Sequence, residues 1–475
     1  MNRRQPAWPV SSSLLAVLVL GFALRVHELG AQSLWYDEAF SRVIVVNSDW
    51  REIWGIMLAY SDVSPLMYVL AKLFVPLFGT TEFGLRIPSV LWGWLTIPVV
   101  YRLGNAISGR FVGVVAAMLM AFSPFSIWYS RDFRPYGMYL FLGSIVLWGF
   151  RRAENRGRPG DWALLIASSA AFYLTHYVSA LFAYAQAMYC MTRIREHPSL
   201  FRRWGGAQLL AVSPVGGWVA AYLINRHPIS RPAWIPPIEA VTPLKTVWNY
   251  LTADAISWNP LTAVGAAIVV LLILWGGRSR LPGQQLLWWW LGLPLLTALL
   301  FSLRVPSYVD RYFLPAIIGV TLLLAMGLLS IPRFLRAIAI SLFAVGLLAG
   351  TIRTYSDPAF AKENWREAAH SANSEGLPIV ALDYETLIGF SPYLSVKEMT
   401  YLAQTEAELS ERLAQGPFIA VVRSPRESAH ALTKSEPFDP AGEGPLFFRQ
   451  WLRDNPSVPV EVRPFAGLAL VILGK

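Results

Sequence analysis

The chain has 475 residues, of which 55% are hydrophobic and only 15% are charged. Soluble domains carry about 25% charged residues, so this composition excludes a wholly soluble protein and indicates that most of the chain faces lipid. The formal net charge is +14 for residues 1–352 (28 Lys/Arg against 14 Asp/Glu) and −4 for residues 353–475 (12 against 16), so the basic excess accompanies the hydrophobic part and does not indicate a nucleic-acid partner.

Eleven apolar segments are candidate membrane-spanning helices, because a helix needs about 20 mostly apolar residues to cross the hydrocarbon core. They are 10–29, 86–105, 111–128, 136–150, 162–176, 177–193, 205–224, 260–276, 286–302, 312–330 and 334–352. The first lacks a small-x-small cleavage site before a polar region, so we interpret it as an uncleaved helix and not as a signal peptide.

The distribution of arginine in the short loops predicts a cytoplasmic N-terminus. Every loop that this orientation places inside is basic: these loops hold Arg3, Arg4, Arg102, Arg110, Arg151, Arg152, Arg156, Arg158, Arg193, Arg195, Arg202, Arg203, Arg278, Arg280, Arg333 and Arg336. An odd number of spans then places residues 353–475 on the outer side. We therefore expect a multi-pass protein of a bacterial inner membrane with an extracytoplasmic C-terminal domain.

Two outer segments are too long to be simple connections. Residues 31–85 contain amphipathic and apolar stretches without a clean span, which predicts helices lying in the membrane interface. Alternatively, residues 64–79 are a true span, which would invert every later element and leave the basic loops on the outer side. Residues 225–259 are rich in Pro and Trp, which predicts an irregular cap over a cavity.

The tail after residue 352 has the pattern of a small α/β domain. "ENWREAAHSANSEG" has helical periodicity, whereas "LPIVALD", "PFIAVVR" and "GLALVILG" are typical of buried strands. Thr405 and Glu408 have the spacing of a capping box at the start of another helix. We therefore predict a transmembrane domain at 1–352, with interfacial helices in 31–85, followed by an extracytoplasmic domain at 353–475.

Charged residues at the predicted outer ends of the spans form the candidate site, because a membrane protein tolerates such groups at interfaces and in cavities. Five different loops contribute Asp37, Glu38, Asp62, Arg86, Arg131, Asp132, Arg134, His176, Asp310 and Arg311. In a helical bundle they would ring one outward-facing cavity, where arginine forks suit phosphate oxygens. Local interpretations remain open: an ion pair within 131–134, a snorkelling Arg86, a structural His176, or a single salt bridge at 310–311.

Other catalytic classes find little support in the sequence. The six histidines form no HExxH cluster, and no GxSxG elbow is present. The single cysteine, Cys190, excludes a disulfide within the chain and a thiolate metal site. We expect no cofactor and no metal, with a divalent ion shared by Asp37, Glu38 and Asp132 as the alternative.

The order of several motifs resembles glycosyltransferase family 39, which includes protein O-mannosyltransferases and the lipid A aminoarabinose transferase. The motifs are "LWYDEAF", "SPLMYVLAKLFVPLFGTTEFGLRIPSVLWGWLTIPVVYRLG", "GVVAAMLMAFSPFSIWYSRDFRPYGMYL", "THY" and "DRYFLP". One departure is that many members carry His-Pro-Pro-Leu where this chain has Val63-Ser64-Pro65-Leu66. The resemblance covers nearly the whole chain and is specific in the order of its motifs.

This resemblance implies a GT-C type of fold and a polyprenyl-phosphate-linked sugar as donor, with a lipid, glycan or protein as acceptor. Asp37 matches the position of the family's catalytic acid, and Glu38 completes the pair. Arg86 and Asp132 match further motif positions. We hypothesise that Asp37 is a general base giving inversion, and that Arg131, Arg134 and Arg311 stabilise the departing phosphate.

Two other functional classes remain alternatives. A transporter or lipid flippase would use the outer charges as a gate, but it predicts ionisable residues near the middle of the spans. A scaffolding protein would bind partners through the tail domain and would leave the outer charges without a role.

Overall fold

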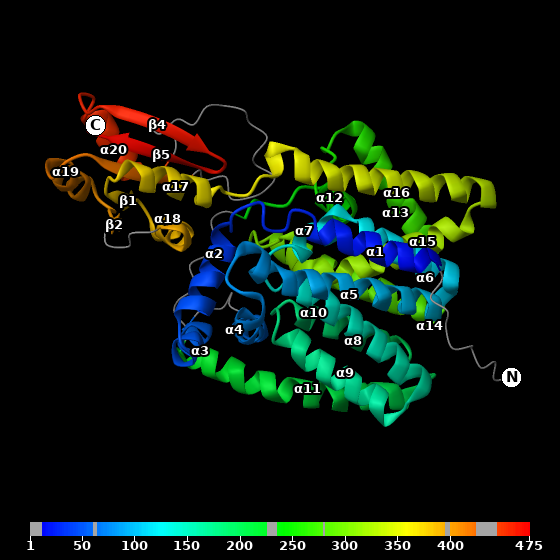
Figure 1. Ribbon diagram of the computed structural model, residues 1–475. Helices are drawn as coiled ribbons and strands as arrows, with labels where there is room; N and C mark the ends of the chain where they lie inside the picture. The colour runs from blue at the N-terminus through cyan, green and yellow to red at the C-terminus, as the bar shows by residue number, and fades with distance from the viewer. Residues whose placement is uncertain (1–11, 60–63, 226–234, 279–280, 395–399, 424–443) are drawn as a thin grey trace. The chain divides into compact units, whose positions relative to one another are not determined.

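The computed structural model describes residues 12–59, 64–225, 235–278, 281–394, 400–423 and 444–475 (Figure 1). The chain divides into two compact units. The helical unit comprises Met1–His27, Trp54–Leu70 and Arg86–Arg353, and the α/β unit comprises Glu28–Ile53, Ala71–Leu85 and Thr354–Lys475. Residues 28–53 and 71–85 of the first outer segment therefore belong to the same unit as the tail, whereas residues 54–70 belong to the helical unit.

Each of the eleven predicted segments coincides with a helix or a pair of helices. The helical unit contains α1 (Ser12–Val26), α5 (Glu82–Ser108), α6 (Arg110–Phe122), α7 (Pro124–Ser130), α8 (Tyr136–Arg156), α9 (Pro159–Tyr173), α10 (Ser179–Thr192), α11 (Pro198–Asn225), α12 (Thr242–Thr252), α13 (Pro260–Gly276), α14 (Pro282–Ser302), the 3-10 helix η2 (Asp310–Ala316), α15 (Ile317–Ser330) and α16 (Arg333–Ser356). Helix α12 lies in the predicted irregular cap, and residues 226–234 of that cap lie outside the described residues.

Four helices of the described residues are long and apolar enough to cross a membrane: Glu82–Ser108, Gly283–Ser302, Asp310–Ser330 and Arg333–Ser356. The pair α6 and α7, bent by 59°, would make a fifth. Helix α4 (Pro65–Phe78) has 14 residues and is about 21 Å long, against a hydrocarbon core of about 30 Å. This length favours the interfacial interpretation of residues 64–79, while the total of eleven spans stays a prediction.

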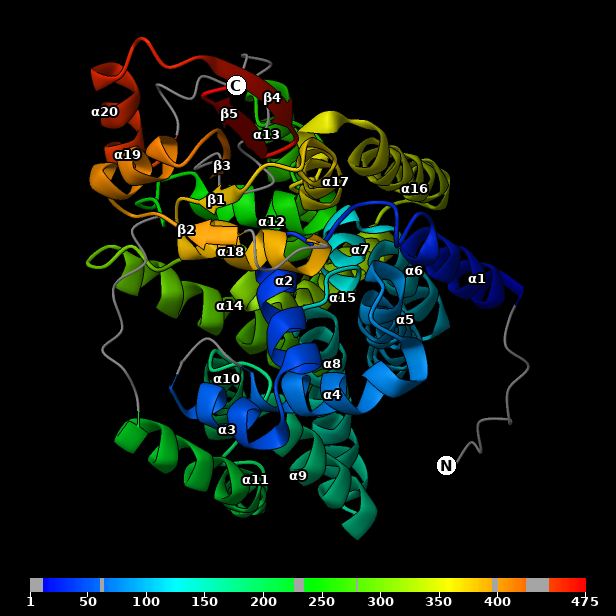
Figure 2. The same cartoon turned by 60° about the vertical axis from the view of Figure 1, so that its left-hand side comes forward.

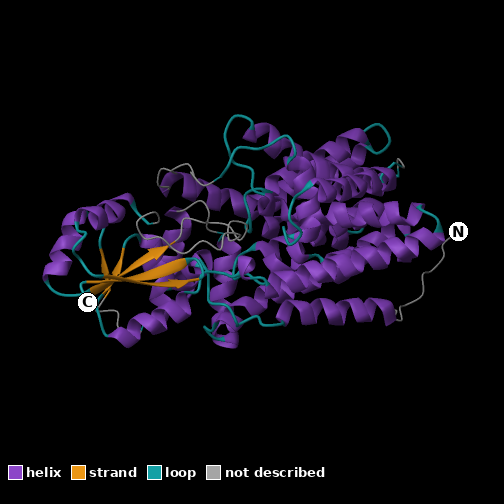
Figure 3. Cartoon of the chain, turned by 90° about the horizontal axis from the view of Figure 1, so that it is seen from above, coloured by secondary structure: helices purple, strands orange, loops and turns teal. Residues whose placement is uncertain are grey.

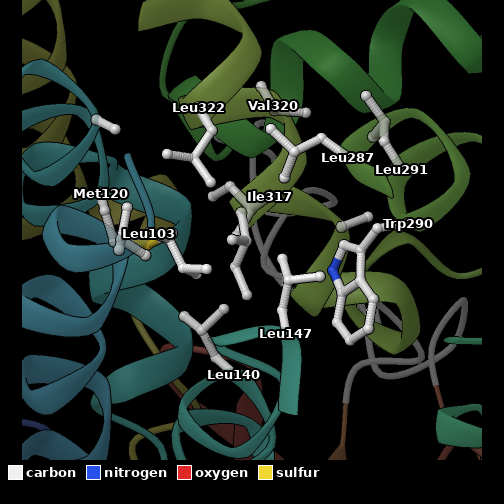
Figure 4. Packing of buried hydrophobic residues seen from close by; sticks show 14 of the residues in the cluster. Leu103, Met120, Leu140, Leu147, Leu287, Trp290, Leu291, Ile317, Val320 and Leu322 are labelled. Atoms are coloured by element: carbon white, nitrogen blue, oxygen red, sulfur yellow. The ribbon is translucent and has the colours of Figure 1, made fainter. Parts of the chain in front are cut away.

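Helix α15 forms the centre of the helical unit. It packs against α6, α13 and α14, and its residues from Ile317 to Leu328 are all buried. Figure 4 shows Ile317, Val320 and Leu322 among leucines from α5, α8 and α14, next to the Trp290 ring. An apolar face on every side explains why α15 has no amphipathic pattern.

The bend between α6 and α7 is held by an arginine of α1. Pro124 has no N–H for the Met120 carbonyl, which is why the helix breaks there. The fully buried Arg25 donates to the carbonyls of Ala121 at 2.9 Å and Met120 at 3.3 Å, and to Ser126 Oγ at 3.0 Å. One guanidinium therefore satisfies the backbone acceptors that the bend exposes.

The α/β unit contains a five-stranded sheet of order β2-β1-β3-β5-β4 (Figure 3). Its strands are β1 (Ile379–Ala381), β2 (Thr400–Leu402), β3 (Phe418–Arg423), β4 (Val460–Phe465) and β5 (Leu468–Leu473). Strand β1 runs parallel to β2 and β3, whereas β5 is antiparallel to β3 and β4. The predicted strands at 377–383, 417–423 and 467–474 are confirmed.

Helices cover both faces of this sheet. On one face α17 (Trp365–Glu375) and α18 (Tyr384–Phe390) bury Trp365 and Phe390 against β1, β3 and β5. On the other face α19 (Glu406–Ala414) and α20 (Leu446–Asp454) bury Leu409, Phe448 and Trp451. The predicted capping box is confirmed, because the Thr405 side chain accepts from Glu408 N and the Glu408 carboxylate accepts from Thr405 N.

Candidate functional site

The turn between α7 and α8 carries Arg131, Asp132 and Arg134. Arg131 donates from Nη2 to the His27 carbonyl at 2.6 Å, which fixes the turn to the end of α1. Ser89 on α5 donates from Oγ to the Arg134 carbonyl at 3.4 Å. Asp132 is buried. The turn is therefore attached to the end of α1 through the Arg131 side chain and to α5 through the Arg134 carbonyl.

Close packing brings Arg86 to the same region. Arg86 and Ser89 are three residues apart and so lie on one side of α5. A Cβ atom at Gly137 would lie 2.6 Å from the Ser89 carbonyl oxygen, so glycine is what lets α8 begin directly against α5. Arg86 is only 2% exposed. Arg86 is therefore a buried residue of α5, one turn of helix before the Ser89 that contacts the 131–134 turn.

The turn at Asp310 and Arg311 is ordered by hydrogen bonds from another helix, α12. Asp310 accepts from Arg311 N through Oδ1 at 2.7 Å and from the Asn249 side-chain amide through Oδ2. Tyr250 on α12 donates to the carbonyls of Asp310 and Phe313 at 3.3 and 3.0 Å. The predicted cap segment therefore contributes a helix that positions this turn.

His176 lies in the turn between α9 and α10, outside both helices. Its ring stacks on Tyr139 and on Tyr177, with centroids 4.8 Å apart in both cases, and Tyr312 approaches it at 5.3 Å. Burial, and then the guanidiniums of Arg134 and Arg311, lower the pKa of His176 to about 3. The imidazole is therefore neutral near pH 7, and Nδ1 accepts from Val178 N at 3.3 Å.

Three loops of the helical unit that carry predicted site residues approach one another. Arg311 Nε donates to the Tyr136 hydroxyl at 3.2 Å, which joins the turn at 310–311 to the start of α8. Arg134 and Arg311 both act electrostatically on His176. Guanidiniums from two loops thus approach the neutral imidazole of a third at one end of the helical bundle, and the positive charge of these guanidiniums suits an anionic ligand.

Asp37 and Glu38 lie in the α/β unit, in the first turn of α2 (Tyr36–Arg42). Glu38 is fully buried; its Oε2 accepts from Trp35 N at 3.3 Å and pairs with Lys362 Nζ at 3.2 Å. Asp37 is partly exposed. The two adjacent acids therefore differ: Glu38 caps its helix and neutralises a lysine, whereas Asp37 retains access to solvent.

The sequence reasoning missed several residues that position the site. Lys362 and Glu363 of the tail bind the segment around α2, and Asn249 and Tyr136 bind the turn at 310–311. The only signal was that Lys362 and Glu363 are charged residues directly preceding a predicted helix. Residues this far apart in the chain share no local sequence pattern from which their contact could be predicted.

Among the described residues, no three His, Cys, Asp or Glu side chains gather in a geometry that could hold a metal ion. The Asp310 carboxylate accepts from Arg311 N and from the Asn249 amide. The divalent-ion alternative therefore has no supporting cluster within the described part of the chain.

Comparisons with known proteins bear out the resemblance seen in the motifs. Residues 62–218 match the family described as dolichyl-phosphate-mannose-protein mannosyltransferase. This match covers about a third of the chain, from within the first outer segment through most of α11. No curated protein matches the sequence at a significant level.

Solved structures show the same fold at low sequence identity. ArnT from Cupriavidus metallidurans, solved with undecaprenyl phosphate bound, is 13% identical and superposes with a TM-score of 0.62 over 98% of this chain and 99% of its own. The archaeal oligosaccharyltransferase AglB from Archaeoglobus fulgidus, solved with an inhibitory peptide and a dolichol-phosphate, is 10% identical with a TM-score of 0.51, over 98% of this chain and 74% of its own. The predicted GT-C type of fold, with its small C-terminal sheet, is confirmed.

Proposed function

We propose that this protein is a membrane glycosyltransferase that moves a sugar from a polyprenyl-phosphate donor to an extracytoplasmic lipid, glycan or protein. The main observation in support is that Arg134 and Arg311 lie close enough to His176, at one end of the helical unit, to lower its pKa. Two proteins of the same fold were solved with polyprenyl phosphates bound, which supports a lipid phosphate as the anion at this end.

The proposed reaction is an attack by the acceptor on the donor sugar. The acceptor oxygen attacks the anomeric carbon, its proton passes to Asp37, and the bond from that carbon to the phosphate oxygen breaks. Polyprenyl phosphate leaves with the bonding electrons, so negative charge grows on its oxygens. Arg131, Arg134 and Arg311 stabilise that charge.

One base is sufficient in this scheme. A phosphate monoester has a second pKa of about 6 and leaves without needing a proton. Attack by the acceptor on the face opposite the phosphate gives inversion, with Asp37 as the base. We propose that no metal takes part, so that addition of a chelator leaves the rate unchanged.

The proposed orientation places the N-terminus in the cytoplasm and the tail outside a bacterial inner membrane. The arginine bias of the inner loops supports it. Fusion of alkaline phosphatase or green fluorescent protein to the C-terminus tests it, because the former is active only outside and the latter fluoresces only inside. An active phosphatase fusion is the expected result.

The decisive experiment is to incubate the purified protein with a panel of polyprenyl-phosphate sugars and a membrane extract as the source of acceptors. Release of polyprenyl phosphate with at least one donor is expected. Nucleotide sugars with the same sugar groups serve as matched controls and should give no product. Transfer from nucleotide sugars alone would indicate a different class of glycosyltransferase. Movement of the intact donor across vesicle membranes without cleavage would indicate a flippase.

A further inference from the structure

The tail domain makes a continuous series of contacts with the segment that leads into Asp37. Five positions between residues 30 and 36 bond to the tail. Gly30 O accepts from Arg366 Nη1 at 3.3 Å, and Gln32 Oε1 accepts from Lys362 N at 3.1 Å. Ser33 Oγ donates to Glu363 O at 2.5 Å, Leu34 N donates to the Tyr393 hydroxyl at 2.8 Å, and Tyr36 N donates to Glu363 Oε2 at 2.8 Å. All these residues belong to the α/β unit. The backbone before α2 is thus held against the tail by hydrogen bonds.

Glu363 is the centre of these contacts. Besides Tyr36 N, its carboxylate accepts from Trp365 Nε1 at 2.9 Å and from Arg423 Nε at 2.6 Å. Arg423 is nearly buried and also lies over the Tyr36 ring, 4.9 Å from its centroid. Charge-assisted hydrogen bonds with little access to water are stronger than neutral exposed ones. Glu363 and Arg423 therefore clamp Tyr36, the residue before Asp37.

A second point of attachment uses Tyr393. Its hydroxyl accepts from Leu34 N and donates to Glu82 Oε1 at 3.1 Å. Glu82 in turn pairs with Arg366 at 3.0 Å. The hydroxyl is therefore satisfied as both donor and acceptor, and it connects the start of α5 to the backbone two residues before Tyr36.

The third point is the buried pair of Glu38 and Lys362, one residue beyond Asp37. Figure 2 shows α2 beside α18, and the two helices pack against each other. Tyr36 and Glu38 are thus each bonded to the tail on either side of Asp37. A residue fixed on both sides has little freedom to change its backbone position.

We propose that the tail domain is the platform that orders residues 30–38 and so positions Asp37, with Glu363 and Tyr393 as positioning residues. This inference rests on the proposed function and gives the tail its role in it. A base contributes to the rate only when it is held within hydrogen-bonding reach of the acceptor hydroxyl. Loosening the segment therefore lowers turnover, while the guanidiniums that bind the donor phosphate stay in place.

The test compares Tyr393→Phe and Glu363→Gln with wild type in the full-length protein. Glu375→Gln is the matched control, because Glu375 pairs with Arg463 and Lys475 wholly within the tail. Hydrogen exchange of peptides covering residues 30–42 reports order, and steady-state kinetics report kcat and the donor KM. We expect both variants to exchange about fivefold faster and to lose about five- to tenfold in kcat with an unchanged donor KM, while the control matches wild type.

Three results would overturn the inference: unchanged exchange in both variants, faster exchange with normal kcat, or a rise in donor KM alone. Wild-type protein that transfers no sugar from any donor would instead overturn the proposed function. The exchange comparison needs no substrate, so it would still decide whether the tail orders the segment.

Discussion

Arg311 and Tyr136 lie 175 positions apart in the chain, and the Arg311 Nε donates to the Tyr136 hydroxyl at 3.2 Å. Tyr136 is itself held by an edge-to-face contact with Tyr129, with ring centroids 5.2 Å apart. A guanidinium that meets a phosphate must be held in one orientation, since its fork geometry is what gives bidentate binding. The hydroxyl of Tyr136 supplies that constraint.

Replacing Tyr136 by Phe keeps the ring packing and removes the acceptor. We expect this variant to lower kcat/KM for the donor about fivefold. Arg311→Ala should lower kcat/KM about 10²- to 10³-fold, because it removes the positive charge. Tyr308→Phe is the control, because Tyr308 bonds Thr246 at 2.7 Å and should stay within about twofold of wild type. A wild-type rate for Tyr136→Phe alongside an inactive Arg311→Ala would show that the anchor is unnecessary.

The two acids of the first outer loop should respond differently to substitution. Asp37→Asn keeps the size of the side chain and removes the base, so kcat should fall about 10²- to 10⁴-fold with normal thermal stability. Glu38→Gln leaves Lys362 without its buried counter-charge, so its main effect should be a lower unfolding temperature. Thermal unfolding in detergent and initial rates separate the two. Full activity of Asp37→Asn would exclude Asp37 as the base.

The helices of the membrane part could be predicted from the sequence because long apolar runs are decided locally. The strand "GLALVILG" and the capping box at Thr405 were predictable for the same reason. Glu363 shows what could not be predicted. Its carboxylate bonds Tyr36 N, and no pattern within a few residues of either one indicates the other. Residues 28–53 pack with the tail through such long-range pairs, so the contacts that position Asp37 could not be predicted from local patterns.

His176 should make the protein less stable in acid. Burial, and then Arg134 and Arg311, hold its pKa near 3, below the ordinary value of 6.5, so the unfolded state binds more protons than the folded state between these two values. Stability is full above about pH 6.5 and falls by about 1.4 kcal/mol per pH unit as the pH drops toward 3. His176→Phe keeps the stacking on Tyr139 and should flatten this dependence, measured as unfolding temperature from pH 7.5 to 4.5. If the unfolding temperature falls equally with decreasing pH in both proteins, a group other than His176 causes the acid sensitivity.

Arg25 illustrates how a charged residue inside an apolar helix can be structural. Arg25→Met would leave the carbonyls of Met120 and Ala121 without these donors in a buried site, and we expect it to lower the free energy of unfolding by about 3 kcal/mol. Arg25→Lys keeps the charge, but one ammonium cannot reach all the acceptors that the two ends of a guanidinium reach, so it should recover only part of the loss.

The control for Arg25 is Arg353, an exposed arginine that donates to the Ala255 carbonyl at 2.8 Å. Arg353→Gln should cost less than about 1 kcal/mol. Helix α7 leads from the bend held by Arg25 directly into Arg131. An Arg25→Met protein that stays folded should therefore also lose activity, because the 131–134 turn would be misplaced. Arg25→Met with normal unfolding temperature and normal turnover would show that lipid or water can replace the guanidinium at the bend.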